Sequence, residues 1–106
     1  YHGPYVLVEC LRGRAEISPG GQHLGLNPSK EQVASLVQQI TEAGFVLFIV
    51  RPSAWYQSSY DSLYPLISTQ LDQLEKSTGK VIGRAVLPLD EGTSLNAYLP
   101  RAKISQ

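Results

Sequence analysis

The stretch Gly44-Phe45-Val46-Leu47-Phe48-Ile49-Val50-Arg51-Pro52 decides the fold of this 106-residue chain. Residues 45–50 form an apolar run of strand length. A run without polar alternation predicts a strand that is buried on both faces and lies centrally in a sheet. Gly44 is typical of a residue that ends a helix in the left-handed conformation, and Arg51-Pro52 ends the strand. The stretch therefore predicts a helix that leads directly into a central strand.

An amphipathic helix is predicted before this strand. Apolar residues recur there at the helical spacing of three or four, namely Val33, Leu36, Val37 and Ile40. Two starts fit the sequence. Asn27 caps the helix with Pro28 in the first helical position, or Ser29 caps it with Gln32 three residues later.

A second helix is predicted over residues 59–78, after a loop of residues 53–59. Pro65 lies in its first turns, where it marks the true start or introduces a kink. Gly79 is the expected C-terminal cap, and a further strand is predicted at residues 80–87. The apolar face of the helix follows the same spacing and comprises Tyr60, Leu63, Tyr64, Ile67, Leu71 and Leu74.

The residues before the first helix predict a hairpin. Residues 5–11 are mostly apolar, and residues 14–17 alternate, with Ala15 and Ile17 expected to face inward. Between them Arg12-Gly13 is a two-residue turn, in which Gly13 supplies a positive φ. A short extended piece at residues 22–26 is expected to pair again.

These elements predict the α+β class. The expected architecture is one small mixed sheet of about four or five strands with two helices on one face, in the order β-β-(β)-α-β-α-β. Residues 1–92 are expected to form a single domain, and residues 93–106 a C-terminal tail or a short final strand.

The charge composition argues against a nucleic-acid role. Nine basic residues balance nine acidic ones, and neither kind forms a run. Nucleic-acid binding draws most of its affinity from a basic surface, so we expect no nucleic-acid partner. The apolar run at residues 45–50 is far shorter than the ~20 residues that span a bilayer, and we expect no membrane span within this segment.

No residues with catalytic or metal-binding spacing stand out. Cys10 is the single cysteine, and the adjacent carboxylate of Glu9 raises the pKa of a thiol rather than lowering it. His2 and His23 lie far apart, whereas a structural zinc site needs about four ligands. Phosphate-binding glycine loops are also missing. The sequence therefore predicts no catalytic residue, metal or cofactor, and favours a role other than that of an enzyme.

One cluster of side chains is a candidate binding site. Arg51 follows the central strand, and Trp55, Tyr56 and Tyr60 lie within nine residues of it. Ligands of open α/β sheets tend to bind beyond the carboxyl ends of strands, and Trp, Tyr and Arg are enriched at binding hot spots. The alternative is structural, with Tyr60 in the core, Trp55 covering the sheet edge and Arg51 solvated.

The order of these elements resembles the extracytoplasmic domain of the ExbD/TolR biopolymer-transport family. The matching stretches are residues 5–17, 29–43, 45–51, 60–76 and 81–87. The segment around Arg51-Pro52-Ser53 also looks like that of uncharacterised bacterial proteins that read "LVRPxG" there. ExbD/TolR proteins carry an N-terminal membrane helix with an essential aspartate, and this segment contains neither. They also usually have acidic or small residues in the turn after the strand, where this chain has Arg51-Pro52-Ser53.

The resemblance implies a non-catalytic protein-interaction or assembly domain that forms dimers, on the periplasmic side of a bacterial envelope. A cytoplasmic segment of a larger protein is the other location considered. The alternative function is a small anionic-ligand binding or enzymatic module, with a pocket near Arg51, Tyr56 and Tyr60, and with Glu9 beside it. An arginine beside aromatic rings suits an anionic or planar ligand.

Overall fold

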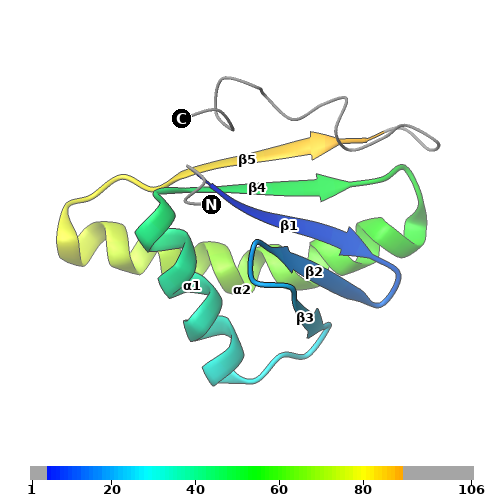
Figure 1. Cartoon of the computed structure of the whole chain (residues 1–106), viewed down its shortest axis with the longest axis horizontal. Coiled ribbons are helices and arrows are strands. Elements are labelled where there is room, and N and C mark those ends of the chain that lie inside the picture. The colour runs from blue at the N-terminus through cyan, green and yellow to red at the C-terminus, as the bar shows by residue number, and fades with distance from the viewer. Residues whose placement is uncertain (1–4, 90–106) are drawn as a thin grey trace.

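Five strands and two helices follow one another along residues 5–89, the part of the chain that the computed structural model describes (Figure 1). This arrangement confirms the predicted α+β class and the predicted order of elements. In chain order the elements are β1 (Val6–Leu11), β2 (Arg14–Ser18), β3 (Gln22–Gly25), α1 (Lys30–Ala43), β4 (Phe45–Val50), α2 (Ala54–Thr78) and β5 (Gly83–Pro88).

The strands form one mixed sheet in the order β3-β2-β1-β4-β5. β1 and β2 form the predicted antiparallel hairpin, with Leu11 opposite Arg14 and Gly13 at a φ of 73° in the turn. β1 is parallel to β4, and β4 is parallel to β5. The carboxyl ends of these three strands therefore lie at the same edge of the sheet, on the right in Figure 1.

Local hydrogen bonds define the start and the end of α1. Of the two predicted starts, the structure has Ser29 as the capping residue. The Gln32 amide donates to Ser29 Oγ at 3.1 Å, and the Ser29 amide donates to Gln32 Oε1 at 2.9 Å. Gly44 ends the helix in the left-handed conformation, with a φ of 87°, as the sequence predicts.

α2 begins earlier than the sequence predicts. Ser53 caps it by accepting a hydrogen bond from the Trp55 amide, so the predicted loop at residues 53–59 is wrong and these residues form the first turns of the helix. Pro65 lies inside the helix and does not start it. Its ring removes a bond to the Asp61 carbonyl, and since both residues are exposed, water can satisfy that carbonyl. β5, in contrast, begins later than predicted, at Gly83 rather than at residue 80.

Both helices pack on one face of the sheet (Figure 1). The main core lies between them and includes the alternate residues Val46 and Phe48 of β4. Leu47 and Ile49 point to the opposite face, where a smaller cluster contains Leu7 and Leu89. β4 is therefore buried on both faces, as its unbroken apolar run predicts.

Arg84 fixes the C-terminal half of α2 to the edge strand β5. Its guanidinium lies 3.0 Å from the Asp72 carboxylate, 3.0 Å from the Glu75 carboxylate and 3.0 Å from Ser68 Oγ. Glu75 also accepts a 2.7 Å hydrogen bond from the Ile82 amide.

Candidate functional site

A cavity of about 400 Å³ opens where the β1–β2 turn meets the first turn of α2. We call it the arginine cleft. Because β1 and β4 are parallel neighbours, the residues that follow each of them reach the same edge of the sheet. The cleft lies beyond the carboxyl end of the central strand β4. Its lining residues are Arg12, Arg51, Pro52, Ser53, Trp55 and Tyr56.

Arg12 and Trp55 form one wall of the cleft. The guanidinium carbon of Arg12 lies 4.1 Å from the centre of the Trp55 ring, in a cation–π contact. Trp55 nevertheless stays 59% exposed, although tryptophan side chains are highly buried on average. This exposed ring leaves apolar area available for contact with a ligand.

Arg51 also lines the cleft. Its guanidinium lies 3.8 Å from the Glu9 carboxylate, and both side chains are largely shielded from solvent. Glu9 therefore neutralises part of the Arg51 charge and restricts where its planar group can point. Glu9 belongs to β1, beside the strand that Arg51 follows, which agrees with the sequence hypothesis that Glu9 lies beside this site.

The amino end of α2 adds further positive potential to the cleft. The unpaired amides of a helix N-terminus carry a partial positive charge, and α2 is 25 residues long with no acidic residue in its first turn. Two arginines and a helix N-terminus thus contribute positive charge or potential to the cleft, and the Glu9 carboxylate offsets part of the Arg51 charge.

Ser59 joins the two elements that carry Arg12 and Trp55. The Ser59 side chain is fully buried. Its hydroxyl donates a hydrogen bond to the carbonyl of Leu11, the last residue of β1, and also lies within hydrogen-bonding distance of the Trp55 carbonyl. A buried hydroxyl that bonds across two elements restricts their relative movement. The positions of Arg12 and Trp55 are thus set by the fold before any ligand binds.

Tyr60 does not line the cleft, whereas the other three candidate residues do. Its ring packs against Phe48 in the main core at a centroid distance of 5.8 Å and against Tyr64 at 5.0 Å. Burial, followed by the neighbouring Tyr64, raises the pKa of Tyr60 above its usual value of 10.0. The structural alternative therefore describes Tyr60, while Arg51, Trp55 and Tyr56 come together.

Arg12, Pro52 and Ser53 line the cleft but are not among the site residues that the sequence predicts. Arg12 is remote in sequence from Trp55, and the sequence predicts only a hairpin turn there. One signal could have found it. Arg12 directly follows β1 as Arg51 directly follows β4, so parallel pairing of these strands predicts that the two arginines meet.

Cys10 is a buried thiol of the main core. Burial, and to a smaller extent the charge of Glu9, raises its pKa from 9.0 to about 12. The adjacent Glu9 alone predicts this direction of the shift, and burial is the larger cause. A thiol in this state is a poor nucleophile at neutral pH, so Cys10 is a packing residue.

The raised pKa of Cys10 makes stability depend on pH. Above pH 9.0 the unfolded chain loses the thiol proton while the folded chain keeps it until about pH 12, so the stabilisation is complete below pH 9 and declines above it. We expect denaturant unfolding to show a loss of about 1 kcal/mol between pH about 7 and about 10. The Cys10→Ala variant, which controls for other groups, should lack this part of the slope. An equal slope in both proteins would contradict the assignment.

Residues 5–89 contain no group of three or more His, Cys, Asp or Glu side chains that could hold a metal ion. Within the same range, neither helix combines the length and the hydropathy that crossing a membrane requires. A comparison with family models, curated proteins and solved structures finds no match to this chain. Function must therefore be inferred from the residues of the site itself.

Proposed function

We propose that this chain is a non-catalytic binding domain that holds an anionic group, a carboxylate or a phosphate, in the arginine cleft. One observation carries the proposal. Arg12 and Arg51 come from different elements and meet in one cavity at the amino end of α2. Arginine presents planar, paired donors that match both kinds of oxyanion.

The lining residues support binding rather than catalysis. General acid–base and nucleophilic catalysis need a titratable group near the operating pH, such as His, Cys, Asp or Glu. The described lining of the cleft consists of two arginines, a proline, a serine, a tryptophan and a tyrosine. Ser53 Oγ accepts the Trp55 amide as the helix cap, and no described base lies beside it among the lining residues.

The exposed Trp55 ring narrows the class of ligand. A small inorganic ion would use the arginines alone, whereas an anionic group attached to an apolar or planar body would also cover the ring. We therefore expect an aromatic carboxylate such as benzoate to bind more tightly than acetate. Isothermal titration with the two compounds measures this difference, and equal affinities would contradict a role for Trp55.

The test of the proposal is a charge-neutralising pair of variants. Arg12→Gln and Arg51→Gln should each weaken benzoate and phosphate binding by about tenfold or more, because each removes a charge-assisted hydrogen bond. Arg14→Gln is the matched control, since Arg14 lies on the same hairpin, is exposed and does not line the cleft. Circular dichroism confirms that each variant is folded. Equal weakening by Arg14→Gln, or no weakening by Arg12→Gln, contradicts the proposal.

The second candidate is the protein-interaction or assembly role, including the ExbD/TolR-like resemblance. The exposed Trp55 beside Arg12 favours it, since tryptophan and arginine are the commonest hot-spot residues of protein interfaces. The mass of the chain in solution, measured by sedimentation, tests self-association. A dimer that Trp55→Ala dissociates supports assembly through this surface, and a monomer at all concentrations contradicts it.

A further inference from the structure

Glu9 places a negative charge beside the arginine cleft. Its carboxylate lies 3.8 Å from the guanidinium of Arg51, and the exposed fraction is 21% for the Glu9 side chain and 24% for that of Arg51. Charges that are shielded to this degree are screened less by water and salt than charges on the open surface. An anion that binds to Arg51 is therefore also repelled by Glu9.

The sheet holds Glu9 in this position. In the strand register Glu9 of β1 lies between Ile49 of β4 and Glu16 of β2. Like charges directly opposite each other on neighbouring strands repel, so the Glu16 carboxylate favours an orientation of Glu9 toward Arg51. The Glu16 carboxylate itself lies 3.9 Å from Nδ1 of His23, its cross-strand neighbour on β3. The fold therefore sets the place of the Glu9 charge before any ligand binds.

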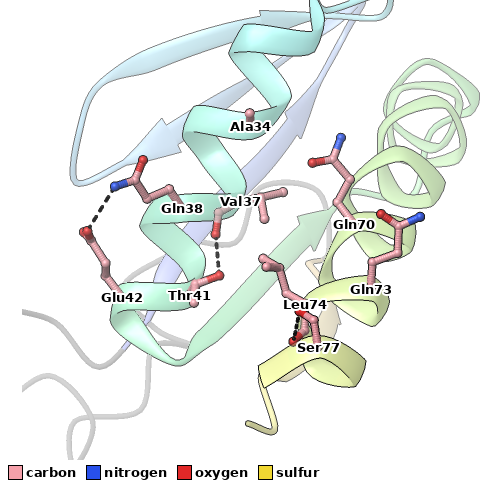
Figure 2. A pocket seen from close by; sticks show the side chains of 9 residues that line it. All are labelled: Ala34, Val37, Gln38, Thr41, Glu42, Gln70, Gln73, Leu74 and Ser77. Carbon is pink, nitrogen blue, oxygen red and sulfur yellow. Dashed lines mark hydrogen bonds between the residues drawn. The ribbon is translucent and has the colours of Figure 1, made fainter. Parts of the chain in front are cut away.

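A second cavity, of about 590 Å³, lies between α1 and α2 (Figure 2). Within residues 5–89, its lining includes one charged side chain, that of Glu42, and neither a lysine nor an arginine. The Gln38 amide donates a hydrogen bond of 3.5 Å to the Glu42 carboxylate. Of the two cavities, the arginine cleft is therefore the one whose lining suits an anion, and Glu42 provides a carboxylate at a different site for comparison with Glu9.

The charge of Glu9 acts unequally on ligands of different charge. A fixed carboxylate repels an anion in proportion to the charge of that anion. A phosphate monoester carries close to two negative charges at neutral pH, so Glu9 repels it about twice as strongly as a carboxylate. The doubly charged group also loses more hydration when it enters a partly enclosed site. Because Glu9 offsets part of the Arg51 charge, the remaining positive charge suits one negative charge better than two.

We propose that Glu9 makes the arginine cleft selective for singly charged anions, so that its ligand is a carboxylate rather than a phosphate ester. This inference rests on the proposed function, because it names the ligand class of the same cleft. Glu9 does not line the cleft. It determines specificity through its charge, which acts both on Arg51 and on the ligand.

The probes are phenyl sulfate and phenyl phosphate, two aromatic esters of closely similar shape that carry one and two negative charges at pH about 8. Benzoate is the third probe. Isothermal titration of the whole chain measures the three dissociation constants. We expect benzoate and phenyl sulfate each to bind more tightly than phenyl phosphate. Tighter binding of phenyl phosphate overturns the selectivity, whereas a failure of all three probes to bind overturns the proposed function itself.

Three variants test the role of the Glu9 charge. Glu9→Gln should shift the ratio of the phenyl sulfate and phenyl phosphate dissociation constants toward phenyl phosphate by about fivefold or more, because it removes the charge at nearly constant size. Glu9→Asp keeps the charge and should keep the ratio within about twofold. Glu42→Gln is the matched control, since it removes the same charge from an exposed residue of the other cavity, and it should leave the ratio unchanged.

The outcomes separate charge from structure. Circular dichroism confirms that each variant is folded. An unchanged ratio in Glu9→Gln overturns the proposal while leaving anion binding by the cleft intact. An equal shift in Glu42→Gln also overturns it, by assigning the effect to the total charge of the chain. An equal shift in Glu9→Asp overturns it by showing that Glu9 acts through packing rather than through its charge.

Discussion

Replacing Phe48 with alanine is expected to lower the free energy of unfolding by about 3–5 kcal/mol, the largest effect of any single change predicted here. Phe48 is fully buried at the centre of β4. The rings of Tyr60 and Tyr64 meet it edge-on, at centroid distances of 5.8 and 5.1 Å. Truncation removes the apolar area, both aromatic contacts and the filling of the space between α2 and the sheet.

Val86 provides the control for Phe48. It lies directly beside Phe48 in the parallel register of β4 and β5, but it is 44% exposed. Val86→Ala should therefore change stability by less than about 1 kcal/mol. Urea unfolding of the three proteins measures the difference. Similar losses for both variants would show that the core is not centred on Phe48.

Gly83→Ala is expected to cost about 1–3 kcal/mol, although it adds a single methyl group. Gly83 is paired with Phe45, whose ring covers it. A Cβ at position 83 would lie 2.8 Å from Phe45 Cε2 and closer still to Cδ2. The ring or the start of β5 must move, and the hydrogen bond of 3.0 Å from the Gly83 amide to the Gly44 carbonyl lies at this point.

A second substitution tests the cause of this loss. In a Phe45→Leu background the added methyl group has more room, so Gly83→Ala should cost less there, with a coupling energy of about 0.5 kcal/mol or more. Gly25→Ala is the control in β3, since a Cβ there meets no atom within 4 Å. Additive effects of the two substitutions would exclude a clash between these side chains.

The sequence predicted the sheet and α1 well because their signals are local. The unbroken apolar run at residues 45–50, the glycine of the hairpin turn and the reciprocal bonds between Ser29 and Gln32 each act over a few residues. The start of α2 was missed because two nearby signals pointed elsewhere. Serine often caps a helix, but Ser59 is buried and bonds to β1. Proline is common in the first turn of a helix, but Pro65 lies in the middle of α2.

Part of the candidate site could be predicted because the residues concerned are close together in the sequence. Arg51, Trp55 and Tyr56 are near one another in sequence, so one strand end and the turn after it were enough to group them. Arg12 enters the cleft through the parallel pairing of β1 with β4, which is a long-range contact. Tyr60 has the helical spacing of a core residue as well as the composition of a site residue, and the aromatic packing with Phe48 decides between the two.

The bond from Ser59 to Leu11 spans 48 positions of the chain, and this separation links ligand binding to folding. Arg12 and Trp55 are adjacent in the folded chain alone, so a ligand that needs both has no site on the unfolded chain. By mass action, such a ligand increases the free energy of unfolding by about 2.7 kcal/mol at a concentration of one hundred times Kd. The melting temperature rises as a result. A thermal-shift screen of carboxylates and phosphates can therefore identify the ligand class before any partner is known.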